Sequence, residues 1–95
     1  MTRQAVERSL REVHARLVKA REELAVLDEQ LGLLVDAADD ARLRSLVSET
    51  PGAAHESSDA QRHLEAFTRA RRALVERIGE LERRQDELLE RLDVD

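Results

Sequence analysis

The side chains that could carry chemistry in this 95-residue chain are carboxylates, three histidines and several hydroxyl groups; cysteine is absent. His14, His55 and His63 lack the i, i+4 spacing of a helical metal site. Ser57 and Ser58 fit turn and capping roles, with no base expected beside them. The carboxylates lie along helix faces, without a pocket that would raise a pKa. We therefore expect no catalytic, cofactor-binding or metal-binding site.

Two long apolar patterns must position these side chains. In each, residues recur at alternating steps of four and three, the spacing of a coiled-coil seam. The first seam comprises Val6, Leu10, Val13, Leu17, Ala20, Leu24, Leu27, Leu31, Leu34, Ala38 and Ala41. The second comprises Leu64, Phe67, Arg71, Leu74, Ile78, Leu81, Gln85, Leu88 and Leu92. They predict an all-α protein, an antiparallel two-helix coiled-coil hairpin with helices over residues 3–48 and 59–93.

The break between the seams contains Pro51. Thr50 precedes this proline and therefore favours an extended backbone, which ends the first helix before it. Ser58 is followed three residues later by Gln61, the capping-box pattern of a helix start. The sequence thus predicts that the second helix starts directly after Ser58 and that the turn spans residues 49–57.

If the helices fold back on each other, the layers of the two seams must match. Matching large and small side chains pairs Leu17 with Leu88, sets Leu34 against Arg71, and centres the hairpin on residues 51–52. A polar residue in a seam lowers stability and specifies the register.

The same register makes predictions for charges beside the seam and for the N-terminus. It places Glu23 near Arg84 and Arg21 near Glu82, both favourable pairs. It also leaves the first turns of the first helix, including Val6, as an unpaired basic overhang.

A single hairpin buries only a narrow apolar stripe, and small scaffolds often gain stability by oligomerising. Several apolar residues lie off the seams and would form a second face: Val18, Val26, Leu33, Val75 and Leu89. We expect a homodimer in which two hairpins form a four-helix bundle.

The apolar pattern changes phase after Ala41. The seam places Ser45 inside, whereas the apolar side chains fall at other positions: Leu43, Leu46 and Val47. Either the first helix kinks or breaks within residues 36–42, or it continues and these side chains stay exposed. Local packing with Phe67 and Ala54 is the favoured outcome, and an exposed docking surface is the alternative.

Asp36, Asp39 and Asp40 stand in the segment Asp36-Ala37-Ala38-Asp39-Asp40-Ala41. This segment resembles the DxxDxA tip motif of the DksA family of coiled-coil transcription factors, which insert a hairpin into the secondary channel of RNA polymerase. The resemblance implies that role for Asp36, Asp39 and Ala41. The chain departs from the family because it has no zinc-finger domain and carries the motif well before the turn. The other interpretation is a solvated acidic face, since the three aspartates fall at outer heptad positions.

The whole chain resembles short Arg- and Glu-rich coiled-coil hairpin proteins of unassigned function from actinobacteria. The resemblance rests on residues 41–51, ARLRSLVSETP, and on residues 79–89, GELERRQDELL. It implies the hairpin fold and no activity.

Composition limits the classes of partner. Charged residues form 39% of the chain, aromatic residues 1%, and the net charge is -5. The acidic balance and the lack of Tyr and Trp argue against nucleic-acid binding. No stretch approaches the roughly 18 apolar residues of a membrane span. We expect one domain, residues 1–95, in a cytoplasmic protein.

The sequence therefore predicts a non-enzymatic protein-protein interaction module. It would self-associate and present its hairpin tip or its N-terminal overhang to a protein partner. The candidate partner-binding residues are Asp36, Asp39, Asp40, Leu43, Leu46 and Val47. The alternative function is a transcription regulator that binds RNA polymerase through the acidic tip.

Overall fold

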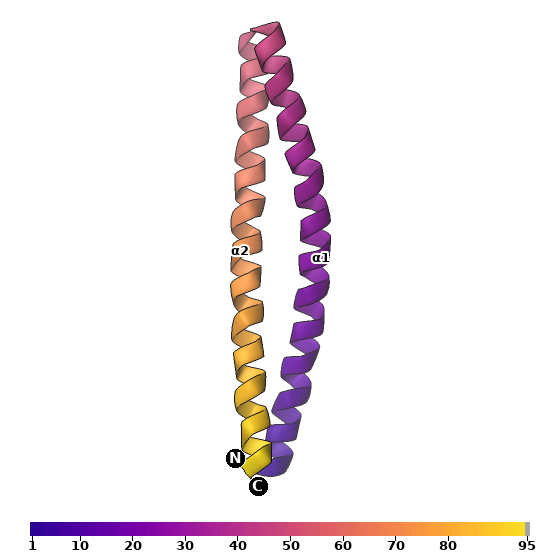
Figure 1. Ribbon diagram of the computed structural model, residues 1–95, viewed down its shortest axis with the longest axis vertical. Helices are drawn as coiled ribbons and strands as arrows, with labels where there is room; N and C mark the ends of the chain where they lie inside the picture. The colour runs from indigo at the N-terminus through magenta and orange to yellow at the C-terminus, as the bar shows by residue number, and fades with distance from the viewer. Residues whose placement is uncertain (95) are drawn as a thin grey trace. The chain divides into compact units, whose positions relative to one another are not determined.

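The computed structural model describes residues 1–94, which form two helices joined by a short turn. Helix α1 spans Arg3–Ser48 and helix α2 spans Pro51–Val94 (Figure 1). No β-strand occurs within these described residues. The prediction of an all-α, two-helix hairpin is confirmed.

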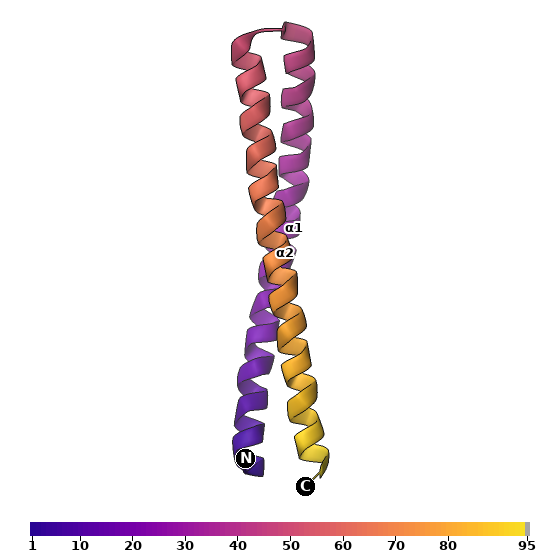
Figure 2. The same cartoon turned by 90° about the vertical axis from the view of Figure 1, so that its left-hand side faces the viewer.

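Contacts divide the chain into two compact units. The terminal unit contains Met1–Leu24 and the chain from Ala73 onward, and the turn unit contains Ala25–Arg72. In each unit, a segment of α1 lies beside an antiparallel segment of α2 (Figure 2). The prediction of a single domain stays a prediction.

Helix α1 has a cap at its start and a left-handed residue at its end. The backbone N–H of Ala5 donates to Oγ1 of Thr2 at 3.1 Å, which satisfies one of the helix's unpaired donors. At the other end, Glu49 has a φ of 51° and its N–H donates to the carbonyl of Ser45 at 3.1 Å. A residue in this conformation stops the helix and redirects the chain.

Helix α2 starts earlier than the capping box predicts. The N–H of Ala53 donates to Oγ1 of Thr50 at 3.2 Å, so Thr50 is the N-cap and Pro51 takes the first helical position. Ser58 lies inside the helix. The predicted start after Ser58 was therefore wrong, and the turn comprises Glu49 and Thr50 rather than residues 49–57.

Helix α1 is continuous through residues 36–42, so the alternative of a broken helix was wrong. Ala38 and Ala41 are buried and Ser45 is half-buried. Because these small residues continue the seam in phase, no break is needed to pack the end of α1.

The apolar core of the terminal unit forms between its two helix segments. Leu17 and Leu88 are fully buried, and Val6 is 1% exposed. Leu10 and Leu92 pack against the same cluster. The predicted overhang was wrong, because Val6 belongs to the core.

The early turn also changes the register of the hairpin. In the terminal unit, Arg77 Nη2 donates to Glu23 Oε2 at 3.0 Å, one heptad from the predicted partner Arg84. Arg21 and Glu82 do form the expected ion pair, at 3.5 Å. A turn centred earlier in the sequence brings earlier residues of α2 beside each residue of α1.

Candidate partner-binding site

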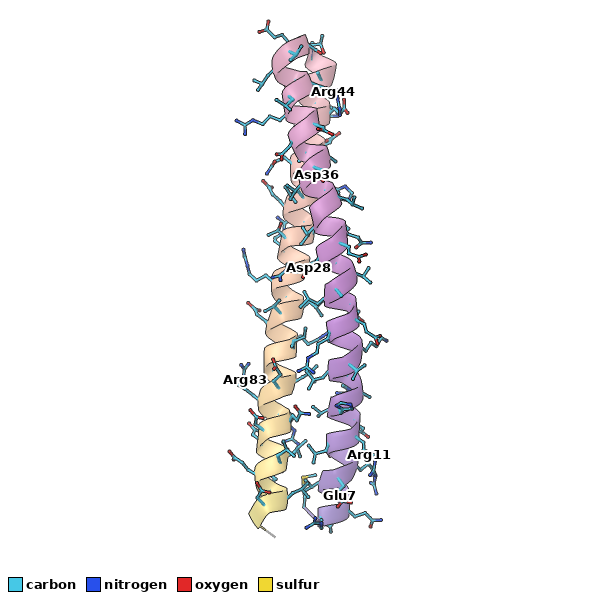
Figure 3. The ribbon with its side chains drawn as sticks, turned by 45° about the vertical axis from the view of Figure 1, so that its right-hand side comes forward. Glu7, Arg11, Asp28, Asp36, Arg44 and Arg83 are labelled. Atoms are coloured by element: carbon cyan, nitrogen blue, oxygen red, sulfur yellow. The ribbon has the colours of Figure 1, made fainter. Side chains whose placement is uncertain are left out.

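All six candidate residues lie on one side of the last turns of α1. From the first aspartate they follow the spacing i, i+3, i+4, i+7, i+10, i+11, which marks one face of a continuous helix. We call this face the α1 outer face; it comprises Asp36, Asp39, Asp40, Leu43, Leu46 and Val47. Asp36 is labelled in Figure 3. Continuity of α1 therefore brings the acidic and apolar candidates into a single surface.

The apolar part of the α1 outer face is open to solvent. Leu43 is 60% exposed, Leu46 is 65% exposed and Val47 is 84% exposed. The favoured prediction, that they pack with Phe67 and Ala54, was wrong. The small side chain of Ser45 takes the seam position instead, and this leaves the neighbouring apolar groups facing outward.

The acidic part of the α1 outer face is also exposed. Within residues 1–94, no ion pair involves Asp36, Asp39 or Asp40. Arg44 lies nearby on α1 (Figure 3), but its guanidinium bonds Glu56 of α2 at 2.6 Å. The three carboxylates therefore keep their hydrogen-bonding capacity for another molecule.

Arg71 and Asp28 form an ion pair in the turn unit that the sequence did not predict. Arg71 Nε donates to Asp28 Oδ1 at 2.6 Å, and Nη2 to Oδ2 at 3.5 Å. This hydrogen bond, and then the attraction between the charges, raises the pKa of Arg71 against a small opposing effect of desolvation. Asp28 directly follows the seam residue Leu27. The predicted register set Arg71 against Leu34, which lies one heptad after Leu27 in α1.

His14, His55 and His63 are all exposed. His55 Nε2 lies 3.2 Å from Asp59 Oδ2, one turn along α2. The ring of His63 meets Phe67 edge-on at 5.2 Å between centroids. Across residues 1–94, no three His, Asp or Glu side chains converge as ligands for a metal ion.

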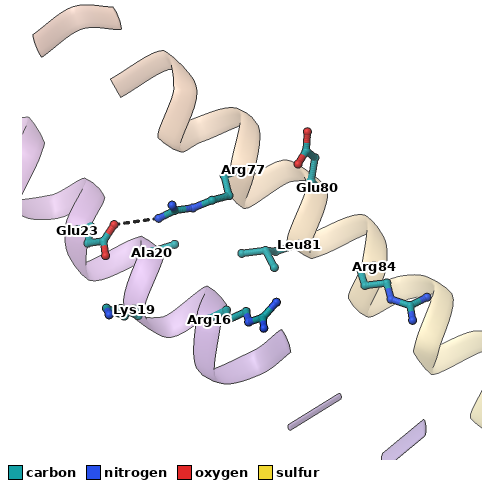
Figure 4. A pocket seen from close by; sticks show the side chains of 8 residues that line it. All are labelled: Arg16, Lys19, Ala20, Glu23, Arg77, Glu80, Leu81 and Arg84. Atoms are coloured by element: carbon teal, nitrogen blue, oxygen red, sulfur yellow. Dashed lines mark hydrogen bonds and ion pairs between the residues drawn. The ribbon is translucent and has the colours of Figure 1, made fainter. Parts of the chain in front are cut away.

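A second candidate site lies in the terminal unit, where sequence analysis did not find one. An open hollow of about 520 Å³ lies between the two helix segments (Figure 4). Its lining includes four basic side chains, Arg16, Lys19, Arg77 and Arg84. The signal in the sequence is the placement of Arg16 and Arg84 directly beside seam positions. That signal acquires meaning only when the register is known, because the register decides which residues face each other.

Comparisons with protein-family models, with curated proteins and with solved structures found no match to this chain. Over residues 1–94, neither helix has a stretch long and apolar enough to cross a membrane. The resemblances to actinobacterial hairpin proteins and to the DksA tip motif stay predictions. The side-chain geometry of the two units is the basis for the proposals below.

Proposed function

We propose that this chain is a non-enzymatic protein-protein interaction module whose α1 outer face binds a protein partner. The observation that carries the proposal is the exposure of Leu43, Leu46 and Val47 on the same face as three unpaired aspartates. Apolar area gains roughly 25 cal/mol per Å² when it leaves water, so this face is more stable when covered. An exposed apolar cluster bordered by charge is typical of a docking surface.

The chemistry of the face specifies its partner. Aspartates at the N-terminal end and apolar side chains at the C-terminal end match an amphipathic helix with leucine-like side chains and flanking Arg or Lys. Such a helix would cover Leu43 and Val47 and would bring cations to Asp36 and Asp39. Opposite charges at the rim improve specificity and the rate of association.

A designed peptide tests this pairing directly. A labelled helical peptide with a leucine stripe and flanking arginines is titrated with the full chain, and its fluorescence anisotropy is measured. We expect the double substitution Leu43→Ser with Val47→Ser to weaken binding about tenfold or more. Asp36→Asn with Asp39→Asn should also weaken it.

The matched control is Val35→Ser, which changes an exposed valine of α1 that belongs neither to the α1 outer face nor to the proposed dimer face. It should leave peptide binding unchanged. Equal binding by all variants, or equal loss in the Val35→Ser control, contradicts the assignment of the face. Circular dichroism confirms that each variant stays helical.

Self-association is part of the proposed function. Five apolar side chains off the seams are exposed and are available to a second copy of the chain: Val18, Val26, Leu33, Val75 and Leu89. We propose that two chains cover these side chains in a four-helix bundle. Sedimentation equilibrium at micromolar concentration should give the dimer mass, and a monomer would overturn this part of the proposal.

The alternative function is regulation of transcription through RNA polymerase. Its support is the exposure of Asp36 and Asp39 without an ion-pair partner in the described chain. Affinity capture from the native host distinguishes the two functions. Capture of polymerase subunits that is lost with Asp36→Asn and Asp39→Asn favours the alternative, and capture that is indifferent to them excludes it.

A further inference from the structure

Two arginines occupy opposing positions beside the seam of the terminal unit. Arg16 directly precedes the seam residue Leu17 on α1, and Arg84 directly precedes the seam residue Gln85 on α2. Residues in this position flank the seam, where coiled coils form their interhelical salt bridges. Both arginines line the same hollow. Like charges therefore stand where opposite charges are expected.

Equivalent positions elsewhere in the chain carry opposite charges. Glu23 and Arg77, each directly before a seam residue, bond at 3.0 Å in the terminal unit. In the turn unit, Arg44 and Glu56 occupy equivalent positions and bond at 2.6 Å. Arg16 opposite Arg84 departs from this complementary pattern, and the repulsion of like charges makes the arrangement unfavourable when nothing lies between them.

The hollow between the arginines is large enough for a small ligand. Its volume of about 520 Å³ lies within the roughly 300–1,000 Å³ of ligand pockets. Ala20 of α1 and Leu81 of α2 contribute apolar lining, and the short side chain of Ala20 leaves the space open. Figure 4 shows Arg16 extending from α1 toward α2, whereas the guanidinium of Arg84 extends along α2 and away from Arg16.

The charge around the hollow is only partly neutralised. Among residues 1–94, neither Arg16 nor Lys19 has an ion-pair partner. Arg84 donates a hydrogen bond to Glu87 of α2 at 3.4 Å. Glu80 also lines the hollow, but Figure 4 shows its carboxylate directed away from the two arginines. The hollow therefore offers cationic groups to a negatively charged ligand.

We propose that this hollow binds a small anion with at least two phosphoryl groups. Arg16 holds the anion from α1, Arg84 turns from Glu87 to hold it from α2, and Lys19 adds a third cation at the rim. The planar guanidinium donates two parallel N–H groups to phosphate oxygens, and such charge-assisted hydrogen bonds are stronger than neutral ones. A bound anion between the two arginines also removes their repulsion. This inference goes beyond the proposed function and uses none of the residues of the α1 outer face.

Pyrophosphate is the probe that tests the proposal. It is titrated into the full chain by isothermal calorimetry, against sodium chloride of equal ionic strength. We expect one site per chain, and we expect Arg16→Gln and Arg84→Gln each to weaken binding about tenfold or more. The matched control is Arg83→Gln, because Arg83 is exposed and extends from α2 away from α1 (Figure 3). This control removes the same charge and should change affinity less than about twofold.

Three results would overturn the proposal. The first is no heat of binding beyond the chloride reference. The second is equal weakening by Arg83→Gln, which would show general attraction to exposed cations. The third is a thermal melt of the protein without the anion. We expect Arg16→Gln to have a higher thermal midpoint than Arg83→Gln, because Arg16→Gln removes the like-charge repulsion. A lower midpoint for Arg16→Gln contradicts the clash on which the site depends. The pyrophosphate and peptide titrations test different residues, so the failure of one proposal does not affect the other.

Discussion

Arg71 of α2 bonds Asp28 of α1 through two hydrogen bonds, the shorter from Nε to Oδ1 at 2.6 Å. Arg71 occupies a seam position, where its charge would be unfavourable in an apolar layer. The long side chain carries the guanidinium to the edge of the seam, where the carboxylate lies. This pairing is available in one register only, so it selects that register at a cost in packing.

Replacing Arg71 with leucine should therefore raise stability while weakening selection of the register. We expect Arg71→Leu to raise the thermal midpoint by a few degrees, because a leucine fills the seam position. Asp28→Asn, which leaves the arginine in place without its carboxylate, should lower the midpoint. Thermal melts followed by circular dichroism measure both. A lower midpoint for Arg71→Leu would show that the ion pair stabilises the fold more than apolar packing does.

The register itself can be tested by cross-linking, since the chain has no native cysteine. The pair Glu23→Cys and Arg77→Cys replaces side chains that bond at 3.0 Å. A short bismaleimide should join these cysteines within the chain much faster than it joins Glu23→Cys and Arg84→Cys. The latter pair corresponds to the register predicted from the seams alone. Faster cross-linking of Glu23→Cys with Arg84→Cys would favour the register predicted from the seams.

The start of α2 gives a matched pair of capping variants. Thr50→Ala removes the oxygen that accepts from the Ala53 N–H at 3.2 Å, and we expect a loss of about 1 kcal/mol of unfolding free energy. Ser58→Ala removes a hydroxyl inside the helix and should change stability by less than about 0.5 kcal/mol. Urea unfolding measures both free energies. A larger loss of stability for Ser58→Ala than for Thr50→Ala would indicate that α2 starts at Ser58, as the capping box predicts.

Two valines on α1 have opposite environments and allow the same substitution to be compared. Val6 is 1% exposed and Val47 is 84% exposed. Val6→Ser should cost on the order of 2 kcal/mol, because it removes buried apolar area and buries a hydroxyl. Val47→Ser should change stability by less than about 0.5 kcal/mol. Equal costs, again by urea unfolding, would indicate that Val47 is packed in solution.

The start of α2 shows how local signals competed. Two capping patterns were present, one at Ser58 with Gln61 and one at Thr50 with Pro51 at the first helical position. The spacing of the second seam also continues back to Ala53 through small residues, which are half-buried in the structure. Such small residues carry a weak apolar signal, so the earlier start was readable but easily overlooked.

The α1 outer face was also only partly predictable from the sequence. The positions of Leu43 and Val47 outside the seam were evident from spacing, but their exposure depended on whether α1 bends. Bending would trade helical hydrogen bonds for apolar burial, and the sequence does not show which is larger. The half-buried Ser45 shows that α1 keeps its phase, and the apolar side chains stay outside.

The sequence by itself determined that the chain forms two helices, each with one apolar seam, because heptad spacing is a local property of each segment. Only the tertiary structure decided which residues face each other. A shift of one heptad again pairs seam positions with seam positions, so apolar spacing alone fits both registers. The turn at Glu49 and Thr50 and the bond between Arg71 and Asp28 separate the two registers. The turn rests on local hydrogen bonds, whereas the bond between Arg71 and Asp28 joins residues distant in sequence. The same choice brings Arg16 opposite Arg84 and so creates the candidate anion site.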